Sequence, residues 1–83
     1  EASILYNTLE MGKNLKIEKN QIKKIKIKMQ QMLQQNNITI DYISIADLKN
    51  FEEIKNCDIR PIVISGAIWY NNVRLIDNVI LKH

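Results

Sequence analysis

The feature that most constrains this chain lies in its last third, where two runs of β-branched residues flank the dipeptide Asn71-Asn72. Two residues are the commonest length of a β-hairpin loop, and asparagine tolerates the positive φ that a type I′ turn requires. A turn at this place fixes the register, because side chains alternate between the two faces of a strand. The sequence therefore predicts a hairpin over residues 60–81 in which Tyr70 faces Val73.

The two faces of this hairpin differ in polarity. One face is apolar nearly throughout and must be covered; it comprises Ile62, Ile64, Ile68, Tyr70, Val73, Leu75, Val79 and Leu81. The other face is mixed, as in a sheet that is packed on one side and partly hydrated on the other. It pairs Trp69 with Arg74, which predicts a guanidinium-over-indole contact. Gly66 lies inside the first strand, where glycine often marks a bulge or a close backbone approach.

Asp77 is the polar exception on the apolar face, opposite Gly66. Buried carboxylates are usually paired. We therefore favour a structural interpretation, in which backbone amides or an arginine such as Arg60 satisfy Asp77 and help to fix the register. The alternative is that Asp77 contacts a ligand or another domain.

Two helices are predicted before the hairpin. Residues 2–11 carry apolar side chains at helical spacing, and Gly12 is expected to end this helix as its C′ residue, with 13–16 as a link. Residues 18–35 form a longer amphipathic helix, which Asn36-Asn37 ends and which is expected to cover the apolar face of the hairpin. Its apolar stripe consists of Ile22, Ile25, Met29, Met32 and Leu33.

A third strand is predicted over residues 38–46. Strict alternation places Ile38, Ile40 and Tyr42 on one face, and Thr39, Asp41, Ile43 and Ile45 on the other. Asp47 is placed to cap a short turn of helix that ends at Phe51. Leu48, Phe51 and Ile54 are expected at the edge of the core, with a polar surface loop over 52–59.

These elements indicate an α+β fold, a three-stranded antiparallel sheet with two helices packed on one face. The pattern leaves open which strand pairs with residues 38–46. A length of 83 residues suits one small domain, residues 1–83. The first residue is Glu1 rather than methionine, so we expect a piece of a longer protein. No apolar run approaches the ~20 residues that cross a bilayer, and no signal peptide is evident. Because Cys57 is the single cysteine, we expect a cytoplasmic protein without an internal disulfide.

The sequence does not present a catalytic constellation. His83 is the single histidine, Ser65 has no nucleophile-elbow motif around it, and Cys57 has no histidine partner. One cysteine and one histidine do not build a zinc site, and no glycine-rich phosphate loop is present. We therefore predict no catalytic, cofactor-binding or metal-binding residue in this chain, and no membrane partner.

The lysine-rich helix over 18–35 suggests an alternative function, a small adaptor that binds nucleic acid or protein. The same interleaving of lysine with apolar residues is typical of a solvated amphipathic helix. Only two arginines occur, and no readable RNA-binding motif is present. No nucleic-acid partner is expected on balance.

Three segments suggest a family. They are residues 40–48 (IDYISIADL), Arg60-Pro61 with the β-branched run after it, and residues 73–78 (VRLIDN). Their arrangement resembles the C-terminal domain of the pantothenate synthetase (pantoate–β-alanine ligase) family, which shows a D-Y-x-x-x-x-D strand and a T-R-L-I-D-N segment near its C-terminus. The helical residues 2–9 look like the helix that opens that domain. The sequence departs from the family at Val73, in place of the usual threonine, and at residues 69–72, in place of a smaller glycine-containing turn.

The resemblance implies the C-terminal lid of an AMP-forming ligase of the coenzyme A pathway. In that family, pantoate is adenylated with magnesium and ATP, and the amine of β-alanine then displaces AMP to give pantothenate. The catalytic and ATP-binding residues lie in an N-terminal Rossmann-like domain, which this sequence lacks and which would be the partner of this one. The resemblance also implies that the full-length enzyme is a homodimer. On this view the 83-residue chain alone is inactive and binds neither ATP nor magnesium.

Overall fold

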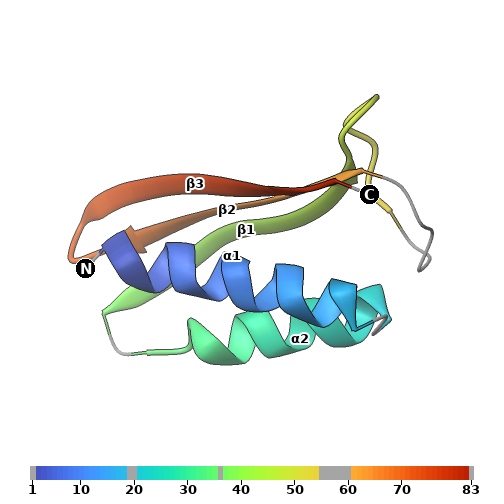
Figure 1. Ribbon diagram of the computed structural model, residues 1–83. Coiled ribbons are helices and arrows are strands. Elements are labelled where there is room, and N and C mark those ends of the chain that lie inside the picture. Colours follow the sequence, from blue (N-terminus) through green and yellow to red (C-terminus); the bar gives the residue numbers. More distant parts are fainter. Residues whose placement is uncertain (1, 19–20, 36, 55–60, 83) are drawn as a thin grey trace.

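The chain folds into two helices and a three-stranded sheet. A computed structural model describes residues 2–18, 21–35, 37–54 and 61–82. The elements in order are α1 (Ala2–Ile17), α2 (Ile22–Met32), β1 (Ile38–Asp47), β2 (Ile62–Tyr70) and β3 (Val73–Leu81). The sheet is antiparallel with the order β1-β2-β3, and both helices lie on the same face of it (Figure 1). The predicted fold class is therefore confirmed, and the open pairing is settled because β1 lies next to β2.

The hairpin forms as predicted. Asn71 and Asn72 both have positive φ, at 51° and 68°, as a type I′ turn requires. The register follows from that turn over the whole length of β2 and β3, from Tyr70 opposite Val73 to Ile62 opposite Leu81. The predicted apolar face is buried or half-buried except for Val73, which lies at the hairpin tip.

The first helix is longer than predicted. It continues through Gly12 to Ile17, so the prediction that Gly12 ends the helix and that 13–16 is a link was wrong. Gly12 is buried, and a β-carbon added to it would lie 2.5 Å from Sδ of Met29 on α2. The glycine is therefore used for the close approach of the two helices rather than for a helix end.

The helix that covers the hairpin is α1 rather than α2. Leu5 and Leu9 of α1 are fully buried, and α1 packs on β2 and β3, whereas α2 packs on α1 and β1. Gly66 of β2 makes this contact close, because a β-carbon there would lie 3.2 Å from Cδ1 of Leu5. The neighbour that comes close to Gly66 is thus a side chain of α1, whereas the nearest backbone atom, the carbonyl oxygen of Tyr42, would lie 3.6 Å from such a β-carbon. The apolar stripe of α2 is confirmed, although the helix is shorter than the predicted 18–35.

A bulge in β1 overturns the predicted alternation of that strand. Asp41 has no partner in β2, since Ile40 pairs with Ile68 and Tyr42 with Ala67. One extra residue in a strand moves all later side chains to the opposite face. Every isoleucine of β1 therefore turns toward the helices, and Tyr42 turns away from them.

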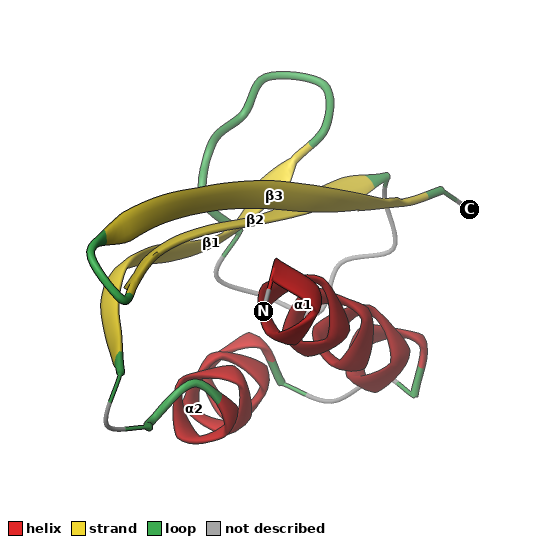
Figure 2. Cartoon of the chain, turned by 90° about the vertical axis from the view of Figure 1, so that its left-hand side faces the viewer, coloured by secondary structure: helices red, strands yellow, loops and turns green. Residues whose placement is uncertain are grey.

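The segment after β1 forms the predicted single turn capped by Asp47, closed by a hydrogen bond from the backbone N–H of Phe51 to the carbonyl oxygen of Asp47, and it does not continue into a longer helix. Oδ1 of Asp47 accepts a hydrogen bond from the backbone N–H of Lys49 at 2.7 Å. Ile54 is buried as expected, but Phe51 is 72% exposed, so its placement in the core was wrong. Figure 2 shows that this loop rises from the sheet on the side away from the helices. The expected loop residues 55–59, with Cys57, lie outside the described residues.

Candidate functional site

Of the three residues that were considered as catalytic groups, Ser65 is the one that the structure describes. Ser65 is half-buried in β2, between Ser44 of β1 and Asn78 of β3. Cys57 and His83 lie outside the described residues. Among the residues that the structure describes, no group of three or more histidine, cysteine, aspartate or glutamate side chains is placed to hold a metal ion. The described helices also include none that is long and apolar enough to cross a membrane.

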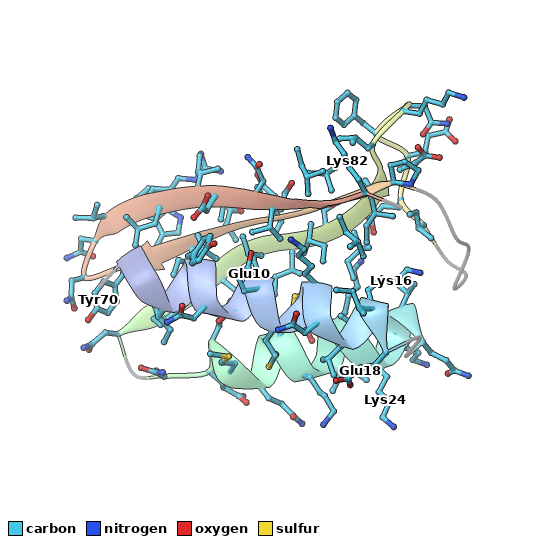
Figure 3. All side chains as sticks on the ribbon, viewed as in Figure 1. Glu10, Lys16, Glu18, Lys24, Tyr70 and Lys82 are labelled. Atoms are coloured by element: carbon cyan, nitrogen blue, oxygen red, sulfur yellow. The ribbon has the colours of Figure 1, made fainter. Side chains whose placement is uncertain are left out.

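Asp77 is held by a backbone amide. Its Oδ1 accepts a hydrogen bond from the N–H of Asn78 at 2.8 Å, which agrees with the structural interpretation; Arg60, the other partner considered, lies outside the described residues. Asp77 also faces α1. The charge of Glu10 is the main cause that raises the pKa of the Tyr6 hydroxyl, and the charge of Asp77 adds to it. Figure 3 shows Glu10 on the side of α1 that faces the sheet.

A second polar cluster ties the loop after β1 to the rest of the fold. Oε1 of Glu53 forms an ion pair with Nζ of Lys26 at 2.7 Å, and the hydroxyl of Ser44 donates to Oε2. Partial burial raises the pKa of Glu53, but the hydrogen bonds from Lys26 and Ser44 and the charge of Lys26 outweigh burial, so the pKa is lowered overall. The cluster joins α2, β1 and the loop. Sequence analysis missed it because Lys26 and Glu53 lie far apart in the chain.

The side of the sheet that points away from the helices is a continuous surface, which we call the outer face. Strand pairing arranges it in four cross-strand rows, Thr39–Trp69–Arg74, Tyr42–Ala67–Ile76, Ser44–Ser65–Asn78 and Ala46–Val63–Ile80. Two of the rows are mainly apolar, and four large apolar side chains on this face are exposed, namely Tyr42, Trp69, Ile76 and Ile80. No helix of the described chain covers them (Figure 2).

One ion pair crosses the outer face. Nη2 and Nε of Arg74 donate to Oδ2 of Asp41 at 2.8 and 3.1 Å, so β3 is joined to β1 across the central strand. The bulge makes this possible, since it frees Asp41 from the β1–β2 register. Arg74 is opposite Trp69 as predicted, but its charged partner, Asp41, was not predicted. Because Asp41 and Arg74 pair with each other, the four rows contain no unpaired charge.

A groove lies between α2 and the edge strand β1. It has a volume of about 520 Å³ and is lined by Ile27, Gln30 and Gln31 of α2, by Gln34 just after this helix, and by residues 40–43. The lysines of α2 lie nearby. Lys26 is paired with Glu53, whereas Lys23, Lys24 and Lys28 are exposed, and Lys24 extends away from the sheet (Figure 3).

Comparisons with known proteins give the chain its relatives. Residues 1–80 match the model of the family described as pantoate-beta-alanine ligase. The chain is 35% identical over 83 residues to a pantothenate synthetase of Thermotoga petrophila, and 37% identical over 83 residues to one of Thermosipho africanus. Each alignment covers 98% of this chain and 29% of the relative. A pantoate–β-alanine ligase of Oryza sativa subsp. japonica is 37% identical over 57 residues, which cover 69% of this chain and 18% of that protein. The chain thus spans less than a third of the length of these curated relatives.

Proposed function

The chain belongs to the pantoate–β-alanine ligase family, and we propose that it is the C-terminal lid domain of such an enzyme. The observation that carries the proposal is the contrast in coverage. The family match takes in 80 of the 83 residues of this chain, and the alignments with the first two relatives named above take in 98% of this chain but only 29% of each relative. We place the reaction centre, with the sites for ATP, magnesium, pantoate and β-alanine, in the remaining part of the parent ligase. The proposal extends to a cytoplasmic, homodimeric parent enzyme.

The proposed reaction has two steps. The carboxylate of pantoate attacks the α-phosphate of ATP, which releases pyrophosphate and forms an acyl adenylate. The amine of β-alanine then attacks the acyl carbon, an amide bond forms, and AMP leaves. Water competes with the amine for the adenylate. A domain that closes over the reaction centre excludes this water, which is a recognised use of lids. We assign that task to this chain and assign none of its residues to the chemistry.

The packing of the chain supports a lid that moves as one body. Leu5, Ile25, Ile45, Ile64 and Ile68 are at most 1% exposed and come from both helices and two strands. A domain with its own core can rotate about a boundary without repacking. We assign no second function to the exposed lysines of α2, because a row of this kind is also what a solvated amphipathic helix presents.

The test compares three polypeptides, namely this chain, the parent ligase, and the parent ligase without residues 1–83. Each is given ATP, pantoate and β-alanine, and both AMP and pantothenate are measured. We expect no product from this chain alone and equal amounts of AMP and pantothenate from the parent. We expect the truncated parent to release AMP in excess over pantothenate, because water reaches the adenylate. Turnover by this chain alone would refute the assignment of the chemistry, and an unchanged ratio after truncation would refute the lid.

A further inference from the structure

We propose that the outer face of the sheet is the surface through which this chain contacts the remainder of its parent ligase. This inference rests on the proposed function and names the contact surface that the lid uses. Ile76 is 59% exposed and Trp69 is 44% exposed, although both lie within strands rather than in loops. Contiguous exposed apolar side chains on a regular element mark an interaction surface.

The loop after β1 supplies an independent observation. Phe51 has a φ of 61°, a left-handed conformation that is strained for a bulky side chain, and it is 72% exposed. Its backbone N–H donates to the carbonyl oxygen of Asp47 at 2.7 Å, and Glu53 anchors the far side of the loop to Lys26 and Ser44. The loop stands on the same side of the sheet as the outer face (Figure 1). The fold therefore holds an exposed aromatic residue, against strain, beside an exposed apolar face.

The charge of the outer face favours an uncharged protein surface as its partner. Within the four rows and the bulge, the charged side chains are Asp41 and Arg74, and they neutralise each other. Interface cores are depleted of unpaired charge in the same way. The lysines of α2 lie on the other side of the sheet, and Lys82, which lies on the outer side, follows the end of β3 and stands outside the four rows (Figure 3). The four rows themselves therefore carry no net charge that would attract a nucleic acid or an acidic partner.

The alternation of apolar and polar rows favours a contact between two domains of one protein that can open and close. The rows that contain Ile76 and Ile80 are apolar, whereas the row of Ser44, Ser65 and Asn78 between them is polar. Obligate dimer interfaces are more hydrophobic than this, while contacts between domains of one chain are more polar. The relatives also contain more than twice as much chain outside the matched region as inside it, since 29% of their length is matched. The remainder of the parent ligase is therefore the occupant that we assign.

The experiment uses two single cysteines in the parent ligase, introduced as Ile76→Cys and Ile27→Cys. Ile76 lies on the outer face, and Ile27 lines the groove between α2 and β1, where it is 45% exposed. If nothing covers this chain, the cysteine at the more exposed position 76 reacts with a maleimide at least as fast as the one at 27. Reaction rates are read at each site by mass spectrometry, with ATP and pantoate present and absent.

We expect the cysteine at position 76 to react about tenfold more slowly than that at position 27 when ATP and pantoate are present, which corresponds to a closed state favoured by about 1.4 kcal/mol. Equal rates under all conditions would overturn the inference, and so would protection at position 27 instead of 76. Protection at 76 that grows with protein concentration would assign the face to a second copy and overturn it as well.

The formation of pantothenate by the same preparation, measured before the maleimide is added, separates the proposed function from the proposed contact surface. Turnover without protection at position 76 means that the contact surface is wrong while the proposed function stands. Protection without formation of pantothenate means that the function is wrong while the contact stands.

Discussion

The two faces of the sheet are built from the same strands and similar residues, yet they have opposite surroundings. In β3, Val79 is 7% exposed while its neighbour Ile80 is 42% exposed. The difference arises because α1 and α2 both pack on one side, so that along β3 after Val73 the residues toward the helices are buried or half-buried while those on the outer face are exposed. In the central strand β2, Val63 and Ala67 are buried on the outer face as well. The comparison teaches that the inner face determines whether this chain folds, and that the outer face is available for contact with another surface.

The largest expected effect on stability comes from a substitution on the inner face. Ile68→Ala removes a fully buried side chain of β2 and should lower the free energy of unfolding by about 2–5 kcal/mol, because a cavity is left in the core. The matched change Ile76→Ala on the outer face should alter it by less than about 0.5 kcal/mol. Urea unfolding of both variants of this chain measures the contrast. Similar losses at the two positions would show that the outer face is also needed for folding.

The second prediction concerns the layer of helices that makes the inner face. Gly12→Leu should cost about 1–3 kcal/mol, since its side chain would collide with Met29 and force α1 away from α2. Gly12→Ala is the control. Its single β-carbon would also lie 2.5 Å from Sδ of the buried Met29, so that side chain must shift. The cost is smaller than for leucine and is offset in part by the helix propensity of alanine, about 1 kcal/mol above that of glycine. Thermal unfolding should therefore separate leucine from alanine, and equal melting temperatures would contradict the close crossing.

The third prediction concerns the turn that assigns residues to the two faces. Asn72→Ile places a β-branched residue at a φ of 68° and should destabilise the chain by about 1–2 kcal/mol. Asn72→Gly should be neutral or slightly stabilising, because glycine adopts this conformation freely. Chemical denaturation of the pair provides the measurement. An isoleucine variant as stable as the glycine variant would argue against the type I′ turn.

The smallest effect concerns the loop beside the outer face. Glu53→Gln removes the charge that binds Lys26, and should cost less than about 1 kcal/mol because the pair is partly exposed. The pKa of Glu53 is lowered from its ordinary value of 4.5, so its carboxylate stabilises the folded state above pH 4.5, and this contribution is lost as the pH falls through the lower folded pKa.

The difference in the free energy of unfolding between the unsubstituted chain and its Glu53→Gln variant should therefore shrink when unfolding is measured below pH 4.5. The control, Glu52→Gln, removes an equal charge from the exposed neighbouring position. A difference that persists unchanged in acid would show that the ion pair is not its origin.

Local patterns were sufficient for the parts of the fold that local chemistry determines. Asn71 and Asn72 fix a turn through their own conformational preference, and the register of β2 and β3 follows from it. Gly12 was misinterpreted because glycine at a helix end and glycine at a helix crossing look alike in sequence. Only the packing of Met29 from another helix separates the two cases.

The missed features depend on contacts between distant segments. The bulge at Asp41 becomes visible only when β1 is paired with β2, and the carboxylate then meets Arg74 from β3. Phe51 was expected in the core because hydrophobicity alone does not reveal that its loop leaves the sheet on the far side. The outer face was predicted to be mixed in polarity and partly hydrated, and both helices lie on the opposite face as predicted. What the pattern assigned incorrectly is the helix that covers the hairpin, because α1 rather than α2 packs on β2 and β3.

The most direct test of the account changes one exposed isoleucine on each side of the sheet, Ile76→Lys and Ile27→Lys, in the parent ligase. The melting temperature and kcat/KM for pantothenate formation are measured for both. We predict that both proteins keep their melting temperature, and that only Ile76→Lys loses about tenfold or more in kcat/KM because the lid no longer closes. Equal activity of the two variants, or a loss confined to Ile27→Lys, would contradict the assignment of the outer face.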